Sequence, residues 1–189
     1  LAAWRANPWD FLTPVDPAPA AAAALPDLSV LRGETRPAAV NVRNASGADV
    51  VLQVGISGLG GGAVTAAEVA WTETKEGVAV AAALPDAPRA GESFRISVPA
   101  GMTRQIWLWI SAAGLSPGRH QAAISLRVPG REAIEVALPV RVIDVAFPTS
   151  TRLHVGGWDY TNTDNFYGLT PQNVTKLVAY LTNRGVDSP

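Results

Sequence analysis

The sequence predicts a mainly β fold, in which an immunoglobulin-like antiparallel β-sandwich over residues 28–148 is followed by a single strand–loop–helix unit. Three observations predict this fold. The 17 glycines and 15 prolines are spread along the chain and separate short apolar segments, which is typical of short strands joined by turns. Within those segments, apolar side chains recur at every second position. Beyond residue 148 the spacing changes to that of a helix.

The N-terminal part, residues 1–27, is expected to be a strand and a connector that pack on the sandwich. Trp4 and Trp9 are the tryptophans of this part, and they are expected to anchor it. Residues 17–26 are rich in alanine and proline, a composition that favours an extended surface connector.

Five segments within residues 28–148 carry the period-two pattern of a strand. Successive side chains of a strand point to opposite faces, so each segment is expected to bury one face and to expose the other. Several such segments, separated by turns, predict two antiparallel sheets packed face to face. The five segments comprise residues 38–43, 50–56, 94–98, 122–128 and 134–142.

Residues 149–189 are predicted to form the first strand, loop and helix of a (β/α)8 barrel. The strand covers residues 152–160, and a polar loop follows it. Thr170-Pro171 opens the helix, because threonine caps a helix well and proline needs no backbone partner at the first helical position. The helix carries one apolar stripe, which comprises Val174, Leu177, Val178 and Leu181.

A single strand and helix need parallel neighbours and a sheet to cover, which leaves two alternatives. Either residues 149–189 dock on the sandwich, or they open an α/β domain whose remaining units are absent from this chain. The second alternative is favoured, because Gly185-Val186 resembles the start of another parallel strand. The chain is therefore expected to be a fragment of a longer protein or one part of a split one.

Composition argues against several functions. Lys and Arg number 15 and Asp and Glu 16, so the net charge is −1 and no basic field is expected to hold a nucleic acid. Cysteine is absent and the two histidines lie outside any ligand cluster, so neither a disulfide, a metal site nor a cofactor is expected. No run of 18 apolar residues predicts a membrane span, and the first residues do not form the apolar region of a signal peptide.

Trp107 and Trp109 share one face of a predicted strand, and Ile106, Leu108 and Ile110 share the other. Because one of these faces must belong to the core, the second is also apolar and has to be covered. The two tryptophans are therefore candidates for an interdomain seam, for packing under a loop, or for a platform on which sugar rings stack.

A second group of candidate residues follows the predicted strand of residues 152–160. Ligands of α/β sheets and barrels bind at the carboxyl ends of strands, so these residues are candidates for substrate binding. They are Trp158, Asp159, Tyr160 and Asn162. The alternative is a loop in which the Asp and Asn side chains bond their own backbone. Asp159 alone is not a glycosidase centre, which needs paired acids or an acid assisted by the substrate.

Several stretches resemble the N-terminal sandwich of the family-123 glycoside hydrolases and their uncharacterised relatives. They comprise residues 4–9, 31–34, 39–44, 98–108 and 115–120. The resemblance covers almost the whole chain, and it implies a β-sandwich that precedes a catalytic (β/α)8 barrel. Residues 153–189 then correspond to the first strand and helix of that barrel.

The resemblance also implies which functional parts lie elsewhere. In family 123, the catalytic acid and its neighbouring carboxylate act with the acetamido group of the substrate, and they lie on later barrel strands. No position here matches them, so no catalytic residue is assigned. The resemblance further implies a carbohydrate substrate, a periplasmic, cell-surface or secreted location, and a remaining barrel in the same or a companion chain.

The function expected from these observations is that of the N-terminal portion of a bacterial carbohydrate-active hydrolase, in which the sandwich braces a catalytic barrel. By itself this segment is expected to be inactive. The alternative is a non-catalytic module that binds glycans or forms an immunoglobulin-like interaction domain.

Overall fold

The computed structural model describes residues 1–189 except for residues 22, 60–62, 149–153, 155–169, 183–185 and 187–189. The chain divides into two compact units, Leu1–Phe147 and Pro148–Pro189. The two units are described separately below.

The first unit is built from short strands, which confirms the prediction of a mainly β protein. In the part of the unit that the structure describes, the strands are β1 (Ala2–Ala6), β2 (Leu28–Arg32), β3 (Thr35–Arg43), β4 (Val50–Ser57), β5 (Val64–Glu68), β6 (Ala70–Glu73), β7 (Ala79–Ala83), β8 (Arg89–Ala90), β9 (Ser93–Val98), β10 (Thr103–Ser111), β11 (Gly118–Arg127) and β12 (Ile134–Ala146).

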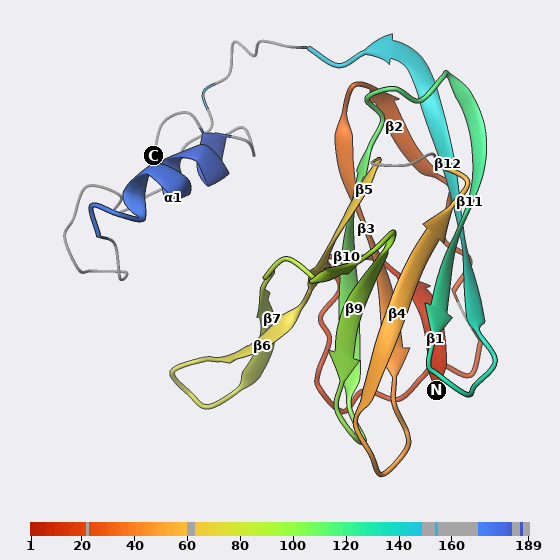
Figure 1. The fold of residues 1–189 in the computed structure, drawn as a ribbon, viewed down its shortest axis with the longest axis vertical. Coiled ribbons are helices and arrows are strands. Elements are labelled where there is room, and N and C mark those ends of the chain that lie inside the picture. Colours follow the sequence, from red (N-terminus) through yellow and green to blue (C-terminus); the bar gives the residue numbers. More distant parts are fainter. Residues whose placement is uncertain (22, 60–62, 149–153, 155–169, 183–185, 187–189) are drawn as a thin grey trace. The chain divides into compact units, whose positions relative to one another are not determined.

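These strands form three sheets. A six-stranded sheet has the order β2-β12-β11-β4-β9-β8, and a four-stranded sheet has the order β1-β3-β10-β5. Strands β6 and β7 form a hairpin of their own, which extends from one side of the unit (Figure 1). All neighbouring strands are antiparallel except β2 and β12, which are parallel.

The six-stranded and four-stranded sheets enclose one hydrophobic core. The six-stranded sheet contributes Leu52 and Ile124 to it, and the four-stranded sheet contributes Val40, Ile106 and Leu108. All five side chains are fully buried. Strand β4 shows the predicted alternation over its first five residues, because Val50, Leu52 and Val54 are buried while Val51 and Gln53 are exposed. The two sheets therefore pack face to face, and we call this arrangement the two-sheet body.

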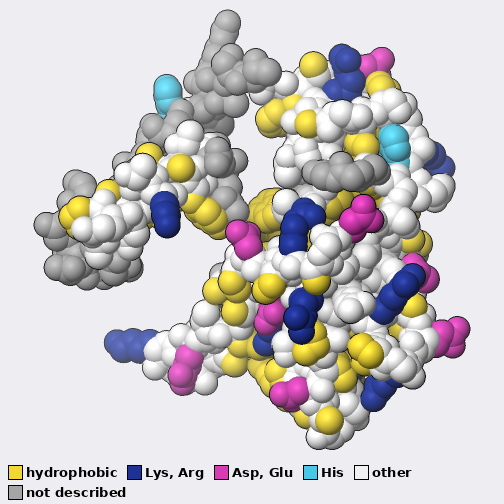
Figure 2. All heavy atoms as spheres, viewed as in Figure 1, with side chains coloured by type: hydrophobic (Ala, Val, Ile, Leu, Met, Phe, Trp, Pro, Cys, Tyr) yellow, Lys and Arg dark blue, Asp and Glu magenta, His cyan; other side chains and the backbone are white. Residues whose placement is uncertain are grey.

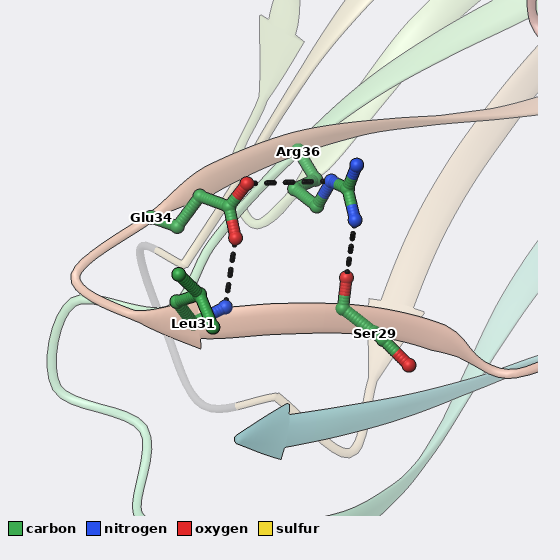
Figure 3. Close-up of polar contacts among 4 residues, drawn as sticks. All are labelled: Ser29, Leu31, Glu34 and Arg36. Atoms are coloured by element: carbon green, nitrogen blue, oxygen red, sulfur yellow. Dashed lines mark hydrogen bonds and ion pairs between the residues drawn. The ribbon is translucent and has the colours of Figure 1, made fainter. Parts of the chain in front are cut away.

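The turn between β2 and β3 takes the chain from the six-stranded sheet to the four-stranded sheet, and polar contacts stabilise this turn (Figure 3). Gly33 adopts φ of +79°, a left-handed conformation that glycine adopts without strain. The carboxylate of Glu34 accepts a hydrogen bond from the Leu31 backbone N–H at 2.7 Å and pairs with the Arg36 guanidinium at 3.4 Å. Arg36 in turn donates to the Ser29 carbonyl at 2.9 Å. The Gly-Glu sequence of this turn thus has a structural role.

One prediction about the strands is wrong. Each segment was expected to expose one face, but residues 38–42 of β3 are buried on both faces. Ala39 and Asn41, on the face expected to meet solvent, are 3% and 6% exposed. The physical reason is that the outer face of the four-stranded sheet is covered by other parts of the first unit, as the next subsection shows.

In the second unit, the described residues include helix α1 (Val174–Thr182). The turn before it begins at Thr170, whose backbone N–H donates to the Asn173 side chain at 2.8 Å and whose carbonyl accepts from the Val174 N–H at 3.0 Å. A helix is therefore present after Thr170, but it begins at Val174 rather than at the predicted Pro171, because residues 171–173 form a turn. None of its residues is buried, and Val178 of the apolar stripe is 47% exposed.

The predicted strand of residues 152–160 lies outside the described residues except for His154, which is exposed, and so do the loop that follows it and the predicted stop at Gly185. Among the helices of the described residues, none is long and apolar enough to cross a membrane.

Candidate functional site

The outer face of the four-stranded sheet is the face that points away from the core. Strand β10 directs Ile106 and Leu108 into the core, so Trp107 points to the outer face. In the strand register, Trp107 lies between Ala39 of β3 and Ala67 of β5. These small neighbours leave room for the indole to lie on the sheet. Trp109 lies on the same face, two residues further along β10.

Trp107 is covered by its own chain. It forms a second hydrophobic cluster with Ala67 and Val69, against which residues 81, 84 and 109 pack. Trp9 covers it from the N-terminal side, with the two rings edge to face at 5.2 Å and 83°. As a result Trp107 is only 5% exposed, and its Nε1 is buried with no hydrogen-bond partner among the described residues.

This geometry bears on the two functions considered for Trp107 and Trp109. We expected the second face of β10 to be apolar and covered. At Trp107 the N-terminal segment and the region of the β6–β7 hairpin cover it. A sugar ring has little surface on Trp107 to stack on while Trp9 covers it. A seam between this face and another domain stays a prediction.

The covering segment, residues 7–16, is held on the sheet by two polar turns. Asn7 donates to the Asp10 carboxylate at 2.8 Å, and the Thr13 N–H donates to the Asp16 carboxylate at 2.9 Å. Thr103 of β10 fixes the second turn, because its N–H and hydroxyl donate to the carbonyls of residues 14 and 16 at 2.7 and 2.6 Å. The predicted anchoring of the N-terminal part thus depends on polar turns as well as on tryptophan.

Two hollows lie on either side of this segment, and residues 10–12 form a wall of both. The first, which we call the polar hollow, has a volume of about 350 Å³ and is lined by Trp4, Arg5, Asp10, Phe11, Asp16 and Asn41 among others. The second, which we call the aromatic hollow, has a volume of about 360 Å³ and is lined by Trp9, Phe11, Val80, Leu84, Gln105 and Trp107 among others. Phe11 is 72% exposed, so its ring is available in the wall between them.

A buried amide pair lies beneath the segment and connects the two hollows. Gln105 of β10 and Asn41 of β3 are opposite each other in the register, and Gln105 Nε2 donates to Asn41 Oδ1 at 3.1 Å. Asn41 lines the polar hollow and Gln105 lines the aromatic hollow. Both side chains are more than nine-tenths buried.

Charge near these hollows is mixed in sign. Arg5 donates to the Pro26 carbonyl at 2.8 Å, and burial lowers the pKa of its guanidinium while Asp27 opposes that shift. At the nearby end of β10, Arg104 forms an ion pair with Glu68, and burial lowers the pKa of Arg104. On the face seen in Figure 2, the described acidic and basic side chains are interspersed rather than gathered by sign.

The other residues expected to form a site are not placed by the structure. Trp158, Asp159, Tyr160 and Asn162 all lie outside the described residues. Among the residues that the structure does describe, no group of three His, Cys, Asp or Glu side chains is arranged to hold a metal ion.

Sequence reasoning missed the polar lining formed by Asn41, Gln105 and Asp10. One signal was present, because Asn41 is a polar residue that follows Ala39, a small apolar residue, on the outer face of its strand. That signal becomes informative only once the N-terminal segment is known to cover the face, since an Asn on an uncovered strand simply meets solvent.

Comparisons with known proteins concern the fold. No family model matches the sequence, and a search of the curated proteins gives no match. Among solved structures, the chain is similar to a family 123 glycoside hydrolase from Clostridium perfringens that was studied for the hydrolysis of glycolipid glycans. The TM-score is 0.57 at 12% identity, and the match covers 84% of this chain and 30% of that one. The chain thus spans less than a third of that hydrolase, and the likeness is one of fold alone.

Two further solved structures give lower TM-scores. A DUF4466 family protein from Parabacteroides merdae gives a TM-score of 0.42 at 16% identity, over 61% of this chain and 40% of that one. A PapD-like domain of human CEP192 gives 0.32 at 11% identity, over 64% and 84%. TM-scores at this level do not establish a shared fold.

Proposed function

We propose that the two-sheet body is the non-catalytic N-terminal domain of a glycoside hydrolase with the architecture of family 123. In this proposal the body is an immunoglobulin-like sandwich, and residues 149–189 open a catalytic (β/α)8 barrel that continues in the same or a companion chain. The observation that carries the proposal is the likeness of fold to the Clostridium perfringens hydrolase, at a TM-score of 0.57.

The extent of that likeness supports a connection between the body and a following domain. The first unit has 147 of the 189 residues, which is a smaller share of the chain than the matched 84%. The match therefore reaches into the second unit. The match also covers only 30% of the hydrolase, so a protein of that architecture has ample length for a catalytic domain beyond the matched part.

Helix α1 gives independent support. It is amphipathic, with one apolar stripe along its length. A helix with an apolar stripe gains stability by burying that stripe against a sheet or another helix. The neighbouring units of a barrel provide such a surface for α1.

The role of the body in this proposal is to brace the barrel. The acid and base of the reaction lie outside this chain, and Trp158, Asp159, Tyr160 and Asn162 line the mouth of the substrate site. The substrate is a carbohydrate, and the location of the protein is periplasmic, cell-surface or secreted, as the family resemblance implies.

The proposal predicts how hydrolytic activity depends on chain length. The natural polypeptide that contains these residues, assayed with its companion chain if it has one, is expected to cleave aryl glycosides that carry a 2-acetamido group. Residues 1–189 alone are expected to show only the background rate, because glycoside hydrolysis needs acidic groups held at a defined separation. The measurement is release of the aryl alcohol by each protein at equal concentration.

Two outcomes would contradict the proposal. Cleavage by residues 1–189 at a rate far above background would show that the chain has a catalytic centre of its own. Failure of the natural polypeptide to cleave any glycoside in the assay would favour the alternative, a non-catalytic glycan-binding or immunoglobulin-like interaction module.

A further inference from the structure

The polar hollow combines features that suit one class of ligand. Its volume of about 350 Å³ falls within the range of small-molecule sites. Its lining has aromatic rings from Trp4 and Phe11, carboxylates from Asp10 and Asp16, and the amide of Asn41. Rings offer flat apolar surface, and the carboxylates and amide offer hydrogen bonds.

Asn41 is the most informative residue of this lining. It is only 6% exposed, and its Oδ1 is already bonded by Gln105 Nε2. Its Nδ2 forms no hydrogen bond with the described residues and is not among the unpaired atoms that are cut off from solvent, so this donor is accessible from the hollow. A ligand oxygen in the hollow can therefore accept a hydrogen bond from this donor in place of water.

The carboxylates complement that donor. Among the described residues, Asp10 accepts one side-chain hydrogen bond, from Asn7 to its Oδ1. Its Oδ2 is therefore available to accept a hydrogen bond from a ligand. A hydroxyl group is both a donor and an acceptor, so one sugar can donate to Asp10 and accept from Asn41. Phe11, at 72% exposure, stands beside Asp10 with its ring free for contact.

Other ligand classes fit less well. Arg5 also lines the hollow, but its guanidinium donates to the carbonyls of Leu25 and Pro26, and an anion would face the carboxylates of Asp10 and Asp16. A metal ion would need several ligands, and no group of three His, Cys, Asp or Glu among the described residues is arranged to supply them. A wholly apolar ligand would leave the Asn41 amide without a partner.

We propose that the polar hollow binds one pyranose ring of a glycan, with Phe11 against an apolar face of the ring and Asn41 and Asp10 bonded to its hydroxyl groups. The choice of a glycan as the ligand class rests on the proposed function. The site lies within the first unit.

The test is saturation-transfer NMR on the 189-residue chain with the methyl pyranosides of glucose, galactose and mannose and of the 2-acetamido forms of glucose and galactose. At least one is expected to receive saturation and to shift the Asn41 side-chain amide signal. Phe11→Ala should weaken that binding at least about tenfold, the factor that about 1.4 kcal/mol of lost contact represents. Phe147→Ala is the matched control, because Phe147 is also exposed and lines neither hollow.

The proposal is overturned if none of the five sugars binds, if binding leaves the Asn41 amide signal unshifted, or if Phe11→Ala binds as the parent chain does. These results are distinguishable from failure of the proposed function. Sugar binding without hydrolysis by the natural polypeptide leaves the site intact and removes the hydrolase, whereas hydrolysis without binding does the reverse.

Discussion

Replacing Trp107 with alanine is expected to lower the free energy of unfolding by about 3–5 kcal/mol, the usual cost of removing a large buried aromatic side chain. Trp107 is 5% exposed and contacts both Trp9 and Trp109, with ring centroids 5.2 and 5.5 Å away. Its removal therefore leaves a cavity between the sheet and the N-terminal segment. The measurement is urea unfolding of the parent chain and the variant, followed by far-ultraviolet circular dichroism.

Trp107→Phe is the matched control. It keeps an aromatic ring in place and removes the buried Nε1 donor, which has no partner among the described residues. Its loss is therefore expected to be well under half of that of Trp107→Ala, because removal of an unpaired polar group offsets part of the lost packing. If the free energy of unfolding of Trp107→Ala instead lies within about 1 kcal/mol of that of the parent chain, the indole is not part of a packed cluster and is available to a ligand.

Replacing Asn44 with alanine is expected to cost about 3 kcal/mol, because several buried polar groups lose their partners at once. Asn44 is completely buried. Its Nδ2 donates to the carbonyls of Ala48, Val98 and Pro99 at 2.8, 3.1 and 3.2 Å, and its Oδ1 accepts from Ser46. The side chain thus ties the turn after β3 to the end of β9.

Two further variants separate the parts of this network. Ser46→Ala removes one partner of Asn44 at a partly exposed position, so a loss of no more than about 1 kcal/mol is expected. Asn44→Asp keeps the size of the side chain but turns an oxygen toward three carbonyls, so its loss at neutral pH is expected to be at least that of alanine. Asn44→Ala with a loss below that of Ser46→Ala would contradict the network.

The recurrence of apolar residues at every second position was sufficient to predict a mainly β protein and the positions of several strands. It works where one face of a strand is covered and the other is exposed, as in β4. It fails for the four-stranded sheet, where Ala39 and Asn41 looked like an exposed face and are buried. Alternation shows which residues share a face, but it does not show whether distant residues of the chain cover that face.

Trp107 and Trp109 illustrate how far a local pattern reaches. Their spacing correctly indicated a second apolar face on β10. What covers that face depends on contacts between residues far apart in the sequence, such as Trp9 with Trp107 and Thr103 with Asp16. The polar hollow depends on the same long-range contacts, so its residues were not recognisable as a set from the sequence.

The proposed bracing role is tested most directly by removing the first unit from the natural polypeptide that contains these residues. The thermal midpoint and kcat/KM of that polypeptide are measured with and without residues 1–147. The account predicts that the shortened protein unfolds at a lower temperature and loses activity, because its barrel has lost a domain that buries part of its surface. An unchanged midpoint together with an unchanged kcat/KM would contradict it.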